Sequence, residues 1–278
     1  MVATALVTGA SRGIGKASAL ALAVAGLDVA IAARTQKEGE GRDDSDTGGG
    51  RPIPGSLEAT AAEIEALGRR ALPVHLDLLD RASLTDAVAT VLAAWGRIDV
   101  LVNNAVHTGA GSMEHIVDLD IGVVETKLEA NVIAPLLLIK EVLPGMLKRG
   151  SGTIIDITSA VAISDPPAPA GEGGWGLAYA MSKGAFHRFA GILAVEHRGG
   201  GIRAFNVEPG FVMTERMEVN ARELGFEGRY RAAPPSVPAA VVAWLATGLT
   251  DVEADQLNGT TITAQKVALD RDLHPDWR

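Results

Sequence analysis

Tyr179 and Lys183 are the two side chains of this sequence whose types and spacing best suit proton transfer. On a helix, residues four apart lie on the same face. Tyrosine is a poor acid or base near neutral pH unless a neighbouring cation lowers its pKa from about 10. Lys183 supplies such a cation, so the pair predicts a site that protonates an alkoxide or deprotonates an alcohol. Taken alone, this spacing is also typical of an exposed helix surface.

A glycine-rich turn follows the first expected strand. Residues 8–15 read TGASRGIG and lead into an alanine-rich stretch. Gly9 permits a tight turn, and Gly13 lets the backbone approach a pyrophosphate. Gly15 lets a helix pack on the strand, with its first N–H groups facing the anion. The position after a strand predicts dinucleotide binding, and an ordinary strand-to-helix loop is the alternative.

The end of the second expected strand indicates which dinucleotide binds. A carboxylate there would accept a hydrogen bond from a ribose 2′-hydroxyl, whereas an arginine would pair with a 2′-phosphate. The chain has Arg34 after two alanines and no acid in the terminal strand positions, and Arg12 offers a second cation on the same side. The pattern favours NADP(H) over NAD(H), with a solvated Arg34 as the alternative.

Short β-branched and apolar runs alternate with longer helical stretches. Consecutive apolar residues are typical of parallel strands buried on both faces. The alternation predicts an α/β fold, a doubly wound parallel sheet of about seven strands with helices on both faces. The expected strands are residues 2–8, 28–33, 71–76, 100–103, 152–158, 202–207 and 260–263, and two of the expected helices are 15–25 and 56–67, the latter capped by Ser56.

Two segments interrupt this alternation. Residues 36–55 and 164–176 are rich in glycine and proline and lack periodicity. A structureless insertion of about 20 residues is uncommon in a compact domain unless it is functional or disordered. Neither segment separates two self-sufficient cores, so residues 1–278 are interpreted as a single domain. The 36–55 insertion follows Arg34, and it either folds over the nucleotide or forms a disordered spacer.

Composition excludes several classes of function. The 278 residues carry a formal net charge of −9, which argues against a nucleic-acid surface. Cysteine is absent, so disulfides and thiolate metal sites are excluded, and no helical His-x-x-x-His pair suggests a metal. The apolar runs are short for a membrane span, and no leader precedes the first strand. We therefore expect a cytoplasmic protein without metal.

In this order, the motifs resemble those of the short-chain dehydrogenases/reductases. The resemblance runs from residue 2 to about 215 and is carried by TGASRGIG at 8–15, Asn103-Asn104-Ala105, Ser159, Tyr179-x-x-x-Lys183 and Pro209-Gly210. It implies one Rossmann-like domain that transfers a hydride between NAD(P)(H) and a carbonyl or alcohol. It also implies that Tyr179 moves the proton, Lys183 supports it and reaches the ribose, Ser159 holds the substrate oxygen, and Asn131 holds a relay water.

The same resemblance extends to the nucleotide. Asp77 matches an acid near the adenine, although it could instead cap the following helix. The predicted cofactor-binding residues are Gly9, Ser11, Arg12, Gly13, Ile14, Gly15, Arg34, Asp77, Leu78, Asn104, Ala105, Tyr179, Lys183, Pro209, Gly210, Val212 and Thr214. The chain departs from the family at Val106, where glycine is common, and at Ala264-Gln265, which replace a glycine pair.

Substrate and assembly are less specifically encoded. Mostly apolar pocket candidates, namely Val106, His107, Val161, Ile163, Trp175, Phe211, Met213 and Met217, suggest a small apolar carbonyl or alcohol substrate. Residues 209–235 are expected to form a substrate lid, whose apolar spacing includes Leu224 and Phe226. The broad apolar arcs of 132–147 and 186–195 predict a homodimer or homotetramer.

Two other classes of function share this fold or its first turn. A non-catalytic dinucleotide-binding regulatory protein could retain the fold, and loss of the tyrosine or lysine would favour it. A methyltransferase also uses a glycine-rich first turn, but it leaves Ser159, Tyr179 and Lys183 unexplained. Because those residues are present, the sequence favours an oxidoreductase.

Overall fold

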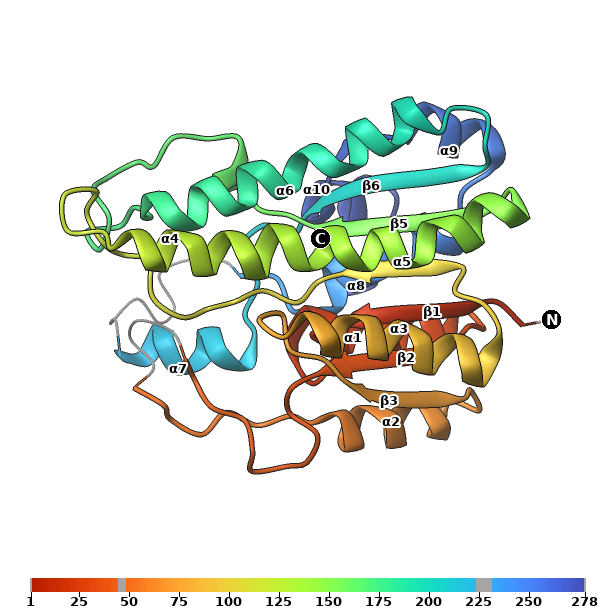
Figure 1. Cartoon of the computed structure of the whole chain (residues 1–278), viewed down its shortest axis with the longest axis horizontal. Coiled ribbons are helices and arrows are strands. Elements are labelled where there is room, and N and C mark those ends of the chain that lie inside the picture. Colours follow the sequence, from red (N-terminus) through yellow and green to blue (C-terminus); the bar gives the residue numbers. More distant parts are fainter. Residues whose placement is uncertain (1, 45–48, 224–231, 278) are drawn as a thin grey trace.

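The fold is organised around one twisted parallel sheet, seen in a computed structural model that describes residues 2–44, 49–223 and 232–277 (Figure 1). The 7 strands lie in the order β3-β2-β1-β4-β5-β6-β7, and every neighbouring pair is parallel. This confirms the sheet predicted from the sequence. The strands are β1 Thr4–Thr8, β2 Asp28–Ala33, β3 Ala71–His75, β4 Val100–Asn103, β5 Gly152–Ile157, β6 Ile202–Glu208 and β7 Thr261–Thr263.

Helices cover both faces of the sheet and divide the core into two layers. One layer packs α1, α2, α8 and α10 against the sheet through residues such as Leu22, Ile64 and Val241. The other packs α3, α5 and α6, with Val88, Leu138 and Leu193 buried. The helices are α1 Gly13–Val24, α2 Leu57–Ala66, α3 Arg81–Trp95, α4 Ile121–Leu128, η1 Glu129–Ile133, α5 Ala134–Arg149, η2 Ala160–Ala162, α6 Leu177–Glu196, α7 Glu215–Glu223, α8 Ser236–Thr247, α9 Asp251–Leu257 and α10 Ala264–Asp270.

Local signals explain where α2 begins and ends. The Ser56 hydroxyl accepts a hydrogen bond from the Ala59 N–H at 3.1 Å, which satisfies one donor at the helix start. Gly68, two residues after the end of the helix, has a φ of 76°, a conformation that favours glycine. The predicted Ser56 cap is therefore confirmed, and Gly68 suits the end of the helix.

The helical stretch from Ile121 to Arg149 runs along one face of the sheet, and Figure 1 shows it as one long rod. Within the described residues it is the one helix long and apolar enough to cross a membrane, although core helices of soluble proteins pass the same test. Leu138, Val142 and Met146 bury one side of it in the sheet core. The π-helical turn η1 interrupts it at Asn131.

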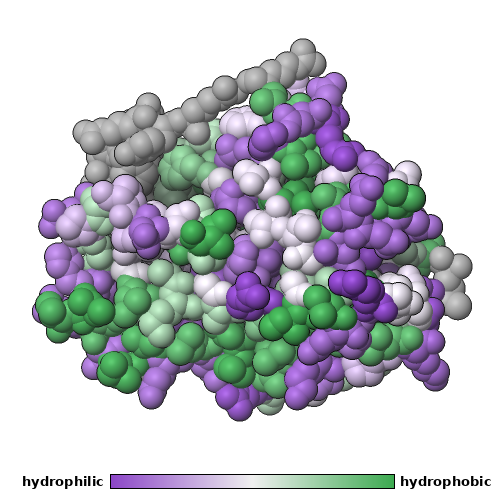
Figure 2. Space-filling view, turned by 90° about the horizontal axis from the view of Figure 1, so that it is seen from above, coloured by the Kyte–Doolittle hydropathy of each residue, from purple (hydrophilic) through white to green (hydrophobic). Residues whose placement is uncertain are grey.

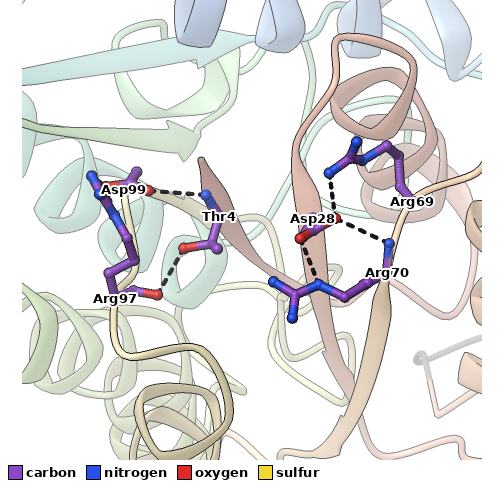
Figure 3. A network of polar contacts seen from close by, with 6 residues as sticks. All are labelled: Thr4, Asp28, Arg69, Arg70, Arg97 and Asp99. Carbon is purple, nitrogen blue, oxygen red and sulfur yellow. Dashed lines mark hydrogen bonds and ion pairs between the residues drawn. The ribbon is translucent and has the colours of Figure 1, made fainter. Parts of the chain in front are cut away.

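Two carboxylates, those of Asp28 and Asp99, tie the strands together at the amino edge of the sheet (Figure 3). Asp28, 1% exposed, accepts hydrogen bonds from Arg69 at 2.6 Å and from the Arg70 side chain at 2.7 Å. Burial alone would raise the pKa of Asp28, but these bonds outweigh burial and lower it. Asp99 accepts a bond from the Thr4 N–H at 2.9 Å. These contacts fix the edge opposite the strand ends that carry the predicted site.

Candidate active site

The predicted nucleotide cleft opens at the carboxyl ends of β1, β2 and β4, where the strand order reverses. A Cβ on Gly9 would lie 2.8 Å from the Asn104 amide nitrogen, and one on Gly15 would lie 2.3 Å from the Gly9 carbonyl oxygen. Only glycine fits these two positions, so α1 begins directly against the strand ends. A turn this close to a helix N-terminus fits the phosphates of a dinucleotide.

The cleft gathers most of the residues predicted to bind the cofactor. Its lining includes Gly9, Ser11, Arg12, Gly13, Ile14, Arg34, Asp77, Leu78, Asn104, Ala105 and Thr214. Within the described part of the chain, Gly15, Tyr179, Lys183, Pro209, Gly210 and Val212 lie outside that lining. The cleft also includes residues not predicted for the cofactor, namely Ala33, Thr35, Leu76, Val106, His107 and Arg216. No local spacing identified Arg216, because it comes from the start of α7, far along the chain.

Asn104 and Asp77 make contacts within the protein at the rim of the cleft. The Asn104 amide donates to the Thr8 carbonyl at 2.8 Å and thus ties β4 to β1. The Asp77 carboxylate accepts from the Leu79 N–H at 3.0 Å, while Asp80 caps α3 through the Ala82 N–H. Asp77 therefore shapes the turn before α3, and the alternative that it caps the helix is wrong.

The replacement of the expected C-terminal glycine pair has a structural consequence. The Gln265 amide donates to the Pro209 carbonyl at 3.1 Å and to the Phe211 carbonyl at 3.0 Å. A Cβ on Gly210 would lie 2.2 Å from the same amide nitrogen. Gln265 thus clamps the turn after β6, from which the lid segment departs.

Lys183 lies beneath the end of β5 with its charge enclosed by protein. Its ammonium donates to the Ile157 carbonyl at 2.9 Å, and the side chain is 5% exposed. Burial lowers the pKa of Lys183 to about 8, an effect that the nearby Asp156 carboxylate opposes. Burial also raises the pKa of Asp156 to about 7, although a hydrogen bond from Asn103 and the charge of Lys183 oppose the rise. The two groups therefore titrate within reach of neutral pH.

Tyr179 and Ser159 come together from different elements. Ser159 lies at the start of η2, just after β5, and its hydroxyl is near enough to the Tyr179 side chain on α6 to lower the pKa of that side chain. Burial raises the pKa of Tyr179, and the nearby Ser159 hydroxyl only partly offsets the rise. The expectation that a cation lowers this pKa is therefore wrong for the protein alone, in which burial is the largest influence on Tyr179.

Asn131 lies in the π-helical turn η1, where the helix widens by one residue per turn. Its side-chain oxygen accepts from the His107 N–H at 2.8 Å, and its amide donates to the Ser182 hydroxyl at 3.1 Å. Ser182 in turn donates to the Tyr179 carbonyl at 2.9 Å. Asn131 thus joins the loop after β4 to the helix that carries Tyr179, and its part in a proton relay stays a prediction. Single π turns often lie at functional sites.

Lys127 is a fully buried cation that the sequence analysis did not identify. Its ammonium donates to the His107 carbonyl at 3.2 Å, to the Gly109 carbonyl and to the Ser112 hydroxyl at 3.2 Å, and it lies 5.9 Å from the centroid of the Tyr179 ring. One helical turn before Asn131, it fastens the same loop. Periodicity could have placed it on the inner face of α4, but a lysine there is ordinarily expected in solvent.

The described residues of the 36–55 insertion, 36–44 and 49–55, contact the glycine-rich turn, and their place over a bound nucleotide stays a prediction. Arg12 donates to the Pro54 carbonyl at 2.9 Å and to the Gly55 carbonyl at 2.8 Å. Arg34 pairs with Asp44 of the insertion at 2.6 Å. Both cations predicted for a 2′-phosphate therefore contact the chain's own oxygen atoms.

The expected lid, residues 209–235, contains α7, and its described residues contact the glycine-rich turn. The Glu215 carboxylate accepts a bond from the Gly13 N–H at 2.9 Å, and a Cβ on Gly13 would lie 3.2 Å from the Thr214 methyl group. Leu224 and Phe226 lie outside the described residues. The start of the lid thus covers the beginning of α1.

A second hollow, of about 740 Å³, lies beside the Tyr179 helix. One wall comes from residues 114–117 and the other from the segment after Ser159, including Val161 and Ile163. The 164–176 insertion adds Pro166, Pro169 and Trp175, so this segment forms part of a mostly apolar groove. In the cleft, Val106 and His107 continue the lining toward the nucleotide side.

We expect Lys127→Met to loosen the loop that Lys127 fastens. The substitution removes three hydrogen bonds while keeping most of the side-chain volume, so the Tyr179 N–H, bonded to the Gly111 carbonyl at 3.2 Å, should exchange with solvent faster. Amide hydrogen exchange measures this effect. The exposed Lys140 on α5 supplies the control, Lys140→Met. Equal exchange in both variants would show that Lys127 does not hold the loop.

Comparisons with known proteins find the same family that the sequence motifs resemble. The family model described as short chain dehydrogenase matches residues 3–44 and 52–224. The chain is 34% identical over 222 residues to the oxidoreductase UcpA of Salmonella typhimurium, a match that covers 79% of this chain and 73% of that protein. It is 32% identical over 259 residues to a 3-oxoacyl-[acyl-carrier-protein] reductase of Synechocystis, covering 92% of this chain and 93% of that one.

A solved structure supports the same conclusion. The 3-oxoacyl (acyl-carrier-protein) reductase of Agrobacterium tumefaciens, solved with NADP bound, is similar with a TM-score of 0.75 at 27% identity over 94% of this chain and 92% of that chain. Together with the glycine-rich cleft and the matched family model, these similarities identify the protein. It belongs to the short-chain dehydrogenase/reductase family and is an oxidoreductase that acts on alcohol or carbonyl groups with NAD(P).

Proposed function

We propose that this protein is an NADP(H)-dependent reductase of small apolar carbonyl compounds, or a dehydrogenase of the matching alcohols. The observation that carries the proposal is that Ser159 and Tyr179 come together from different elements, with Lys183 one helical turn away from Tyr179 on α6. A hydroxyl pair backed by a buried cation suits an oxygen atom that gains or loses a proton.

Each of the four proposed catalytic residues has a separate role in this proton transfer. When bound, the nicotinamide supplies or accepts the hydride. Ser159 holds the substrate oxygen beside the Tyr179 hydroxyl, which donates a proton to a nascent alkoxide or takes one from an alcohol. Lys183 stabilises the resulting phenolate by its charge. Asn131 fastens the loop after β4 to α6, and both segments border the site. We assign to Asn131 the role of holding the relay that returns a proton to Tyr179.

The substrate class is inferred from the groove beside α6, the helix that carries Tyr179. Val161, Ile163 and Trp175 give its walls a mostly apolar character, and the Ile163 side chain is available for contact because this residue is 64% exposed. An apolar wall favours a hydrocarbon substituent next to the reacting oxygen, because burying that surface releases water. A carbonyl or alcohol with an apolar body therefore fits best.

The preference for NADP(H) is inferred from charge at the ribose end of the cleft. Arg12, Arg34 and Arg216 all line it. No carboxylate ends β2, whose last residues are alanines. Three guanidinium groups suit a 2′-phosphate, which accepts several charge-assisted hydrogen bonds.

Tyr179→Phe tests the catalytic proposal. The substitution keeps the ring but removes the transferable proton, so kcat should fall by about 10²–10⁴ while NADPH still binds. Steady-state turnover of an active apolar ketone and fluorescence titration of NADPH measure the two effects. Near-wild-type turnover in this variant would exclude Tyr179 as the proton donor.

Asp156→Asn tests the buried charge beside Lys183. Removing a carboxylate that raises the pKa of Lys183 should move this pKa below its value of about 8. Because Lys183 acts as a cation, activity should decline at high pH, and in the variant the decline should begin at lower pH. The pH profile of kcat/KM measures this shift, with the exposed Asp86→Asn on α3 as the control. An unchanged alkaline limb would contradict the coupling.

Arg34→Ala tests the cofactor preference. Wild-type protein should bind NADPH more tightly than NADH. Arg34→Ala removes one contact to the 2′-phosphate, worth about 1.5–3 kcal/mol, and should therefore narrow the difference between the two affinities by about one to two decades. Calorimetric titration of both nucleotides provides the comparison. Lys37→Ala is the control: it removes the charge of an exposed lysine on the insertion and should leave the difference between the two affinities unchanged. Equal wild-type affinities would refute the assignment.

We also propose that the protein forms a homodimer or homotetramer through α5 and α6. Both helices expose hydrophobic side chains, namely Leu136 and Leu147 on α5 and Ile192 and Val195 on α6. Figure 2 shows contiguous hydrophobic stretches toward one edge of the face seen from above. A second copy related by twofold symmetry is the simplest cover for such a surface.

Light scattering at micromolar concentration should give a mass of two or four chains. Val195→Glu should shift the protein toward monomer, because it places a charge in the proposed contact. Val252→Glu on α9 is a matched control, since both valines are 67% exposed. A monomeric wild type, or equal effects of the two variants, would argue against this interface.

A further inference from the structure

The anion-binding groups of the nucleotide cleft are already in contact with carboxylates of the chain. Arg34 donates to the Asp44 carboxylate at 2.6 Å, and Arg216 lies 3.4 Å from an oxygen of Asp43. The Gly13 N–H, at the start of α1, donates to the Glu215 carboxylate at 2.9 Å. Both arginines and Gly13 line the cleft, so these pairs lie where a dinucleotide carries its phosphates.

The fold of the insertion places Asp44 beside Arg34. Asp43 donates its N–H to the Arg51 carbonyl at 2.8 Å, and Ile53 donates to the Gly41 carbonyl at 3.1 Å, so the two arms of the insertion pair. Ile53 is 2% exposed and anchors the paired arms. Arg12 then fastens the second arm through the Pro54 carbonyl. The Asp44 carboxylate is therefore presented by a paired segment.

Glu215 reaches the start of α1 from an element 202 residues away in sequence. Backbone N–H groups at a helix N-terminus attract negative charge through unpaired donors and the helix dipole. Arg12, the residue before α1, makes no side-chain cap there. The carboxylate of Glu215 therefore supplies the negative charge at this helix end.

We propose that Asp44 and Glu215 each occupy one phosphate subsite and thereby set cofactor affinity separately. A 2′-phosphate must displace Asp44 from Arg34, whereas a 2′-hydroxyl carries no charge that competes for that arginine. The pyrophosphate is common to both nucleotides and must displace Glu215. Asp44 therefore acts against NADP(H) alone, and Glu215 acts against both cofactors. This inference rests on the proposed use of the cleft for the nucleotide.

The test compares Asp44→Asn and Glu215→Gln by calorimetric titration of the full-length protein with NADPH and NADH. An exposed ion pair is weak, so Asp44→Asn should tighten NADPH binding about two- to five-fold and raise the NADPH:NADH affinity ratio by the same factor. Glu215→Gln should tighten both nucleotides about two- to five-fold and leave the ratio unchanged. Asp86→Asn, which makes the same change in net charge outside the cleft, should alter neither.

A double-mutant cycle adds a readout that general loosening of the insertion would not produce. In an Arg34→Ala background, Asp44→Asn should no longer tighten NADPH, because the competition needs both partners. The inference is overturned if Asp44→Asn tightens both nucleotides equally, changes neither or weakens NADH alone, or if Glu215→Gln alters the ratio. A wild type that prefers NADH but gains NADPH affinity in Asp44→Asn would refute the proposed NADP(H) preference and leave this inference intact.

Discussion

The close approach of Gly15 to the Gly9 carbonyl is the contact on which the cleft depends. A Cβ on Gly15 would lie 2.3 Å from that oxygen and 2.4 Å from the Asn104 amide, so any other residue would push α1 away from the strand ends. Because β1 and β4 are neighbours while their connections run to opposite faces, a crevice opens at their carboxyl ends. The helix N-terminus then faces that crevice with N–H groups that have no partner within the helix itself, and the first of them, that of Gly13, donates to Glu215.

Around this cleft the protein buries several charged side chains. Lys127 and Lys183 are both buried, and each donates to carbonyl oxygens at the ends of neighbouring segments. Asp156 lies opposite Asn103 and Asn206 in the sheet register, which forms a polar row below α6. Burying these groups is unfavourable unless partners compensate, and the partners are the loops that shape the site. The same burial moves the pKa values of Asp156 and Lys183 toward neutrality, the range in which proton transfer is useful.

Two segments beside the nucleotide cleft each place a carboxylate against one of its anion-binding groups. The insertion after β2 and the start of α7 both bring carboxylates to positively polarised groups, Asp44 to Arg34 and Glu215 to the first N–H of α1. On a chain of net charge −9, some of the anion-binding groups of the cleft are thus already paired with carboxylates of the protein itself. Gln265 holds the turn after β6 from which α7 departs, so the position of Glu215 depends on the C-terminal segment as well.

Short-range pattern by itself determined the strands, the glycine-rich turn, the Ser56 cap and the Tyr179–Lys183 pair, because each is a property of residues adjacent or one turn apart. The tertiary structure alone decided that Lys127 is buried, that Arg216 reaches the cleft and that the insertion folds onto Arg12. It also decided that burial raises the pKa of Tyr179. These features join segments tens to hundreds of residues apart, and their charges respond to solvent exclusion, which depends on how the whole chain packs and has no local signature.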